Sequence, residues 1–309
     1  MSFNSSLNPS VVKTTLDDVF MQEWNYKNHP GFADATSSKV FKQNTSSNAA
    51  EIQEVFKGVG LWESFNEEAD VPEDEARITN QKTFSMVNYG KSMDVPKNFF
   101  DDNMHGAYSK MTKDFAEKGR ATRDQNAFAI FRGAFATATT ADGAYLVSDT
   151  HTTISGATVD NKLTAALDEP SLNDAIKMLV EQKDQAGVIM GTMPETLIVP
   201  SALYKLACEI TDSEQRSGTA DNDMNVYSTK YGINVATSNR IGAAAGGSDT
   251  AWFLLGRNHG ITRWVRQGVN TDLVNYKFQR NNNYIYKANY REVIGCMDYA
   301  GIVGSDGSV

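Results

Sequence analysis

Few residues in this chain have the types and spacing that support catalysis. The four histidines, His29, His105, His151 and His259, are scattered, and none belongs to the His-Glu-x-x-His helix that binds zinc. Asp149 and His151 lie in an expected loop and could supply a metal pair or a catalytic base, so a metal- or His-dependent hydrolase is one alternative. The GxSxG, Walker and GxGxxG motifs are absent. We therefore expect no catalytic residue, no metal or cofactor site and no enzyme.

A short acidic motif resembles the beginning of a calcium-binding loop, but its later positions do not fit. Asp221, Asp223 and Asn225 have the spacing of the first ligands. Val226 then stands where the turn requires glycine, and Gly232 stands where the loop requires a bidentate glutamate. A polar loop is therefore the better interpretation.

Composition limits the class of protein. The chain has 309 residues, of which 40% are hydrophobic and 22% charged, as is ordinary for a globular protein. Its net charge of -9 argues against a protein that wraps nucleic acid tightly, because phosphate binding needs clustered cations. Cys208 and Cys296 are too few for a disulfide-rich secreted fold and indicate a reducing compartment. The sequence shows no signal-peptide pattern and no apolar segment of about 18 residues, so we expect no membrane contact.

The strongest helical pattern covers residues 104–138. Its apolar residues recur every three or four positions, at Met104, Tyr108, Met111 and Phe115 and again at Phe128, Phe131 and Phe135. Gly119 interrupts the pattern and costs about 1 kcal/mol relative to alanine. Basic residues occupy the other face and form either a solvated surface or a ligand-binding strip. They are Lys110, Lys113, Lys118, Arg120 and Arg123.

A long hairpin and an aromatic arm precede this helix. Residues 52–59 and 83–89 have strand-like patterns, and an acidic, turn-rich segment separates them. Because an isolated two-stranded hairpin is marginal in water, we expect it to lean on another surface, with Trp62 and Phe65 adding apolar area. In the arm, Phe20 and Trp24 lie on the apolar side of a short expected helix. Two alternatives stay open for them, docking on their own domain or on apolar surface elsewhere.

The remainder of the chain mixes helices and strands, which makes the fold class α+β. We expect helices over residues 171–179, with Ser171 in a capping box with Asp174, and over 201–210. Buried or half-buried strands are expected at 196–199, 252–255, 261–265, 284–289 and 292–297.

Several C-terminal and central strings resemble the Mu-like major head subunits of tailed bacteriophages. The strings are Trp252 to Ile261, Asp298 to Gly307, Gln182-Lys183-Asp184 followed by Gly187, and Leu197 to Pro200. The resemblance extends from about residue 100 onward, and its order and spacing are more specific than any single string. It implies the HK97-like phage capsid fold, with an N-terminal arm, an extended loop hairpin, a long spine helix in a peripheral domain and a mixed axial domain.

The resemblance also implies boundaries for these parts. The arm would cover residues 1–50, the extended loop hairpin 51–103, the spine helix 104–138, the axial domain 139–283, and the C-terminal strands that return to the peripheral domain 284–309. Because only about 50 residues precede the hairpin, we expect a separate scaffolding protein to replace the long N-terminal scaffolding region of some relatives.

The function that the resemblance implies is that of a major capsid protein, a virion component assembled in the host cytoplasm. Copies would form hexamers and pentamers of an icosahedral shell around double-stranded DNA, which would lie against the shell without specific binding. A portal, a scaffold and a decoration protein are the other expected partners. The alternative on the same fold is an encapsulin-like nanocompartment that encloses protein cargo.

We expect contacts between copies to combine charge and aromatic area. The acidic segment from Glu67 to Glu75 would face the basic strip from Lys110 to Arg123 of an adjacent copy. The acidic balance of the chain would also leave an inner wall to which DNA does not adhere. The candidate contact residues are Phe20, Trp24, Trp62, Phe65, Glu67, Glu68, Glu73, Asp74, Lys110, Lys113, Lys118, Arg120 and Arg123.

Overall fold

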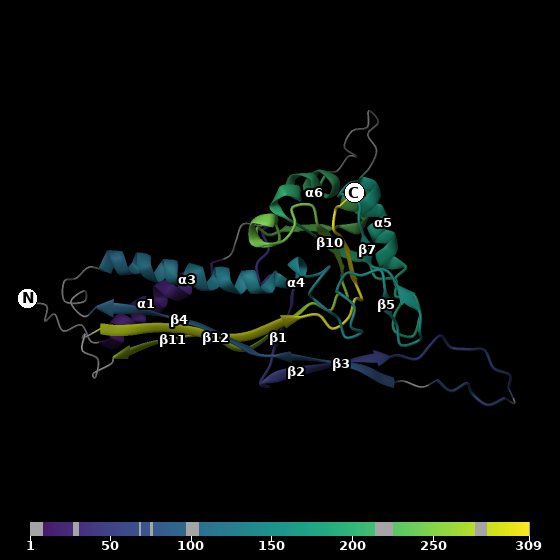
Figure 1. Cartoon of the computed structure of the whole chain (residues 1–309), viewed down its shortest axis with the longest axis horizontal. Coiled ribbons are helices and arrows are strands. Elements are labelled where there is room, and N and C mark those ends of the chain that lie inside the picture. The colour runs from purple at the N-terminus through teal and green to yellow at the C-terminus, as the bar shows by residue number, and fades with distance from the viewer. Residues whose placement is uncertain are drawn as a thin grey trace, which may run out of the picture.

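The computed structural model describes residues 9–26, 31–67, 69–74, 77–96, 105–213, 225–275 and 283–308. These residues form an elongated body with a long helix beside one sheet and a second helix-and-sheet unit next to it, and a hairpin projects beyond them (Figure 1). None of the described helices combines the length and apolar character that a bilayer crossing requires.

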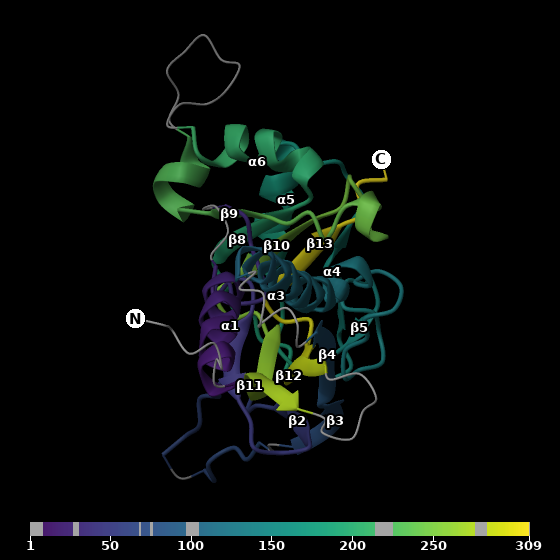
Figure 2. The ribbon, with the colours of Figure 1, turned by 90° about the vertical axis from the view of Figure 1, so that its left-hand side faces the viewer.

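A four-stranded sheet lies beneath two helices at one end of the body. Its strands, in spatial order, are β1 (Lys42–Thr45), β11 (Thr262–Asn275), β12 (Asn283–Gly295) and β4 (Val87–Pro96). β12 is antiparallel to both β11 and β4, whereas β1 runs parallel to β11. The helices α1 (Pro9–Trp24) and α3 (His105–Ala127) lie side by side over one face (Figure 2).

Aromatic packing holds these helices to the sheet. Tyr286 and Tyr290 lie four residues apart in β12, so their side chains point to the same face of the sheet. Phe20 of α1 packs edge-on against Tyr286, and Trp24 packs against Tyr290 at 5.4 Å between ring centroids. Gly119 of α3 makes room for Trp24, because a Cβ atom there would lie 2.9 Å from the Trp24 ring. The glycine that looked like a weakness in the helix is therefore a packing position.

The second unit contains a five-stranded sheet that is covered on both faces. Its strands, in spatial order, are β7 (Lys162–Leu163), β13 (Ile302–Ser305), β10 (Trp252–Gly256), β8 (Pro194–Val199) and β9 (Asn234–Thr237). Trp252 and Leu254 face α5 (Glu169–Val180) and α6 (Tyr204–Thr211), whereas Phe253 faces Phe131 in α4 (Ala129–Arg132). Both faces are apolar, so β10 reads as an uninterrupted hydrophobic run.

The remaining described elements are short. They are β5 (His151–Thr152), β6 (Thr158–Val159), and the single turns η1 (Ser201–Leu203), η2 (Tyr227–Tyr231) and η3 (Ala243–Ala245).

The hairpin is a separate two-stranded sheet of β2 (Ala50–Lys57) and β3 (Arg77–Ser85). Its base is anchored, because Phe84 stacks on Trp264 of β11 at 4.9 Å between ring centroids. Gly295 of β12 permits this stacking, since a Cβ atom there would collide with the Phe84 ring. Beyond this anchor the strands and their connecting loop extend away from the body (Figure 1).

The structure corrects several expectations about element boundaries. The helix expected over 104–138 ends at Ala127, and the short α4 follows it, while Met104 lies outside the described residues. The two strands expected at 284–289 and 292–297 are one strand, β12. At α5 the capping residue is Asp168, whose carboxylate accepts from the Ser171 backbone N–H at 2.7 Å, so Ser171 occupies the third helical position rather than the cap.

Candidate functional site

The projecting hairpin carries the largest set of exposed apolar side chains that the structure describes. Trp62 is 95% exposed and Phe56 is 62% exposed. The other apolar residues of the strands and loop that are more than half exposed are Ile52, Val59, Leu61, Phe65, Val71 and Ile78. Single exposed apolar residues are ordinary, but a continuous group of this kind marks an interaction surface.

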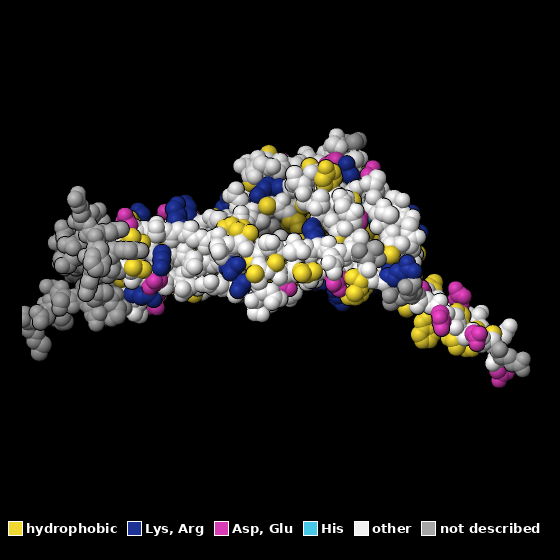
Figure 3. All heavy atoms as spheres, turned by 60° about the horizontal axis from the view of Figure 1, so that its bottom comes forward, with side chains coloured by type: hydrophobic (Ala, Val, Ile, Leu, Met, Phe, Trp, Pro, Cys, Tyr) yellow, Lys and Arg dark blue, Asp and Glu magenta, His cyan; other side chains and the backbone are white. Residues whose placement is uncertain are grey.

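Acidic side chains lie among these apolar residues. Glu63, Glu67, Asp70 and Glu73 are exposed, and Figure 3 shows hydrophobic and acidic groups intermixed along the projecting segment. Asp74 has a local role, because its carboxylate accepts from the Gly60 backbone N–H at 2.6 Å and pairs with a lysine of β2. Of the predicted contact residues, Glu68 lies outside the described residues.

The basic face of α3 divides into exposed and buried parts. Lys110, Lys113 and Lys118 are exposed, as a binding strip requires. Arg120 instead donates to the Tyr26 carbonyl oxygen at 2.9 Å and pairs with Glu23. Arg120 therefore holds the end of α1 within its own chain.

Arg123 is buried, so the prediction of a single solvated basic face is wrong at this position. Its guanidinium lies 3.8 Å from the Asp124 carboxylate and 4.9 Å from the Trp24 ring centroid. Asp124 in turn accepts from the Ala35 backbone N–H at 3.0 Å. Burial lowers the pKa of Arg123 and raises the pKa of Asp124. This group ties the N-terminal segment to α3.

Phe20 and Trp24 lie in the interior of the chain itself. They are 1% and 7% exposed, and they pack between α3 and β12. The hydroxyl of Tyr286 donates to Asp17 at 2.8 Å and fixes α1 further. Of the two alternatives for these aromatic residues, docking on their own domain is the one that the structure contains.

The structure does not bring Asp149 and His151 together as a catalytic pair. His151 is fully buried, and its Nδ1 atom lies 2.7 Å from the carboxylate of Asp142, while Asp149 is exposed. Burial acts to raise the pKa of Asp142, but hydrogen bonds from His151 and Thr140 outweigh it and lower that pKa. A fully buried histidine that is paired with a carboxylate in this way supports the fold. Within the described ranges no group of three or more His, Cys, Asp or Glu side chains could hold a metal ion.

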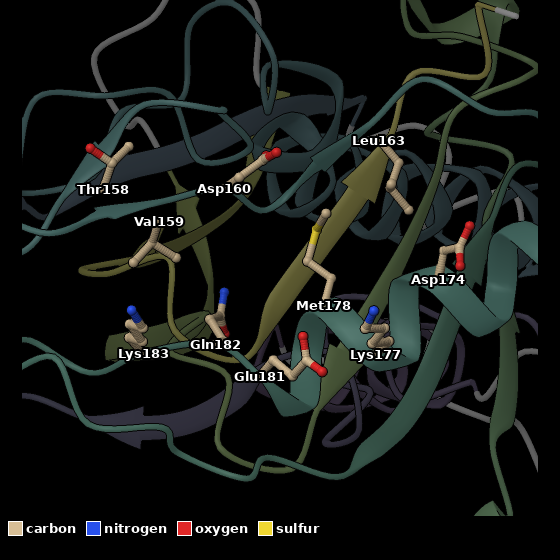
Figure 4. Close-up of a pocket in the computed structure, with 10 residues that line it drawn as sticks. All are labelled: Thr158, Val159, Asp160, Leu163, Asp174, Lys177, Met178, Glu181, Gln182 and Lys183. Carbon is tan, nitrogen blue, oxygen red and sulfur yellow. The ribbon is translucent and has the colours of Figure 1, made fainter.

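A groove of about 480 Å³ lies along α5 (Figure 4). Leu163 and Met178 line it. Its charged residues are of both signs, with Asp174 and Lys177 on α5 and Glu181 at the C-terminal cap of that helix. Mixed charges around a partly apolar floor are typical of a protein surface, and they do not converge on one reacting group.

Comparison with known proteins identifies the chain's relatives. A family model described as phage capsid protein matches residues 81–305. No curated protein matches.

Solved structures with a similar fold cover nearly the whole chain. A virus-like particle from Pyrococcus furiosus has a TM-score of 0.58 and 12% identity, over 94% of this chain and 98% of that one. The capsid of cyanophage P-SCSP1u has a TM-score of 0.55 and 12% identity, over 91% of each chain. The capsid of the native GTA particle has a TM-score of 0.55 and 11% identity, over 92% of this chain and 94% of that one. At these identities the likeness concerns the fold.

Proposed function

This chain belongs to the phage capsid protein family, and from that membership we propose that its projecting hairpin joins copies into a closed shell. It is a structural protein of the virion with the HK97-like fold. The narrower resemblance to Mu-like head subunits stays a prediction. The observation that carries the proposal is the set of exposed apolar residues on β2, β3 and their loop, which one chain cannot cover by itself.

The geometry supports a contact in which different surfaces of two copies meet. The hairpin projects from one side of the body, while the exposed lysines lie on α3 (Figure 1). A contact between unlike surfaces repeats from copy to copy and closes into a ring when the rotation permits. We propose hexamers and pentamers as those rings. Exposed charge pairs contribute only about 0–1 kcal/mol each, so the acidic hairpin and Lys110, Lys113 and Lys118 would set register while apolar area supplies affinity.

The domain roles are proposals too. Within the range 51–103, we propose that β2, β3 and their loop are the extended loop, whereas β4 belongs with the peripheral sheet because it pairs with β12. We also propose that 104–138 begins with the spine helix α3 and that 139–283 is mostly the axial domain. The two sheets interleave in sequence, because β11 lies beside β12 whereas β13 lies beside β10. We therefore propose that β11 belongs with the peripheral sheet and β13 with the axial one.

The family match favours a phage shell over the encapsulin-like alternative. A separate scaffold, a portal, a decoration protein and packaged double-stranded DNA are proposed partners of that shell. The net charge of -9 agrees with a wall that DNA approaches without adhering.

Electron microscopy of the purified chain, alone and with a co-expressed scaffold, tests this function. We expect closed shells, or pentamers and hexamers that close when scaffold is added. A variant in which a short turn replaces residues 58–76 is the matched control, because it keeps the body and loses the exposed loop. Chains that remain single under all these conditions would contradict the proposal.

A further inference from the structure

An aromatic pocket of about 180 Å³ lies between the helices and the four-stranded sheet. Phe20 and Trp24 of α1, Phe115 of α3, Tyr89 of β4 and Tyr290 of β12 form its walls. The Tyr89 and Tyr290 rings stack at 5.1 Å between centroids, which leaves flat aromatic surface on one side of the pocket. Such a pocket suits a planar apolar group.

The rim of this pocket is exposed and basic. Gly90 and Gly119 lie on it without side chains, and the exposed Lys91 and Lys118 flank it from β4 and α3. Thr122, one turn further along α3, is exposed at the same rim. An incoming group with acidic neighbours would therefore meet favourable charge.

Tyr290 lines the pocket with its ring, while its hydroxyl is buried. Tyr290 is only 7% exposed, and its hydroxyl has no hydrogen-bond partner among the described residues. Burial and the nearby Glu292 carboxylate raise the pKa of Tyr290, so the hydroxyl stays protonated at neutral pH. Because this hydroxyl is closed to solvent, Tyr290 contributes to the pocket as an aromatic ring and not as a polar group.

The hairpin loop carries a group that matches the pocket. Trp62 is 95% exposed, whereas the other three tryptophans, Trp24, Trp252 and Trp264, are buried. Its flat indole ring carries an N–H donor, and the exposed Glu63 and Glu67 accompany it. The loop that β2 and β3 carry projects away from α3 and β4 (Figure 1). Trp62 is therefore not inserted in the pocket of its own chain, in agreement with its exposure.

We propose that the aromatic pocket of one copy receives Trp62 from the hairpin of a second copy. The indole stacks against the pocket walls, while Glu63 and Glu67 face Lys91 and Lys118. This inference rests on the proposed shell function and assigns its main aromatic contact. Because Trp62 and the pocket belong to different surfaces, every copy can insert its own Trp62 into one neighbour and receive the Trp62 of another, as a ring requires.

Disulfide trapping between two variants tests the contact directly. Leu61→Cys chains, which keep Trp62, and Thr122→Cys chains, both with Cys208→Ser, are mixed under assembly conditions and oxidised. We expect a disulfide-linked dimer in the mixture and at least tenfold less of it in either variant alone. Lys205→Cys, exposed on α6, replaces Thr122→Cys in the matched control and should give the same low yield as the single variants.

Two outcomes of this experiment overturn the inference in distinguishable ways. Shells that form without linking Leu61→Cys to Thr122→Cys above the Lys205→Cys control would overturn the pocket assignment and leave the shell function standing. A chain that forms no assembly in any state, wild type included, would overturn both.

A complementation experiment tests the same contact without cysteines. Trp62→Ala removes the inserted indole. Thr122→Trp fills the pocket from its exposed rim and leaves the buried walls unchanged. Each variant alone should assemble at least tenfold less than wild type. Their mixture should form one-to-one pairs, because the Thr122→Trp chain keeps Trp62 and the Trp62→Ala chain keeps an open pocket. Normal assembly by both single variants would overturn the proposal and assign the pocket to another occupant.

Discussion

Two antiparallel strand pairs in this chain both carry apolar side chains, but helices cover only one of the pairs. β11 and β12 lie beneath α1 and α3, where Phe20 and Phe115 cover Tyr286. β2 and β3 are also antiparallel, but Phe56 and Ile78 remain largely exposed outside their anchored base. The first pair completes its burial within the chain, whereas the second leaves apolar area that only another molecule can cover.

This difference separates stability from assembly. Burial of apolar area stabilises the body of each copy before any contact forms. The hairpin contributes little to the stability of a single chain, because a two-stranded sheet without a covering layer is marginal. Changes in the body should therefore lower the free energy of unfolding, and changes in the hairpin should lower the extent of assembly.

The largest expected effect comes from reversing the hairpin's charge. Replacing Glu67, Glu68, Glu73 and Asp74 by lysine places positive charge opposite the exposed lysines of α3, so we expect assembly to be blocked or misdirected. Sedimentation velocity and electron microscopy would measure this. Glutamine and asparagine at the same positions are the matched control and should give a smaller loss. Normal shells from the lysine variant would refute the charge pairing.

A pair of phenylalanine substitutions tests the comparison within one residue type. Phe131 is buried between the α3–α4 segment and β10, so Phe131→Ala should cost about 3–5 kcal/mol of stability. Phe56 is 62% exposed, so Phe56→Ala should change the free energy of unfolding of the single chain by less than about 1 kcal/mol and weaken assembly instead. Urea unfolding of dispersed chains measures the first quantity and light scattering the second. Equal losses of stability in both variants would contradict the division.

Acid should weaken the body through a buried histidine. Burial, with the nearby Lys42 cation, lowers the pKa of His259 from 6.5 to about 4. Between pH 6.5 and about pH 4 this histidine is therefore protonated in the unfolded chain but not in the folded chain. The free energy of unfolding falls as the pH is lowered through this range. A shift of this size corresponds to about 3 kcal/mol. The free-energy difference between wild type and His259→Asn should change by about that amount between pH 7 and pH 4, and a constant difference would exclude this histidine as the cause.

The smallest expected effect concerns the crossing of α1 and α3. Helix propensity alone predicts that Gly119→Ala stabilises the chain by about 1 kcal/mol. A Cβ atom at this position would lie 2.9 Å from Trp24, so we expect the gain to be cancelled or reversed. Thermal unfolding measures the outcome, and Gly268→Ala, where a Cβ atom would meet nothing within 4 Å, is the control. A full gain from Gly119→Ala would show that α1 does not pack tightly here.

The sequence predicted the positions of helices and strands better than their exact ends and their contacts with other elements. The spacing of Tyr108, Met111 and Phe115 located α3, and the hydrophobic run of β10 located a buried strand. The end of α3 at Ala127 was missed, because the apolar repeat continues through α4 and hides the break.

The candidate contact surface shows the same limit. Arg123 was grouped with the exposed lysines of α3, because no local pattern reports that Trp24 of α1 covers it. Nor does local sequence separate Phe84, which stacks on Trp264, from Phe56, which remains 62% exposed, because both lie in strands of one hairpin. That distinction depends on contacts remote in sequence.

Acrylamide quenching of tryptophan fluorescence, in dispersed chains and in assembled particles, tests the central claim most directly. Trp62 is the one tryptophan that is exposed in the single chain, so it reports on the hairpin. If other copies complete the hairpin's burial, the quenchable fraction of the emission should be present in dispersed chains and disappear on assembly, with a shift of the emission to shorter wavelength. A Trp62 that remains equally quenchable in intact particles would contradict that claim.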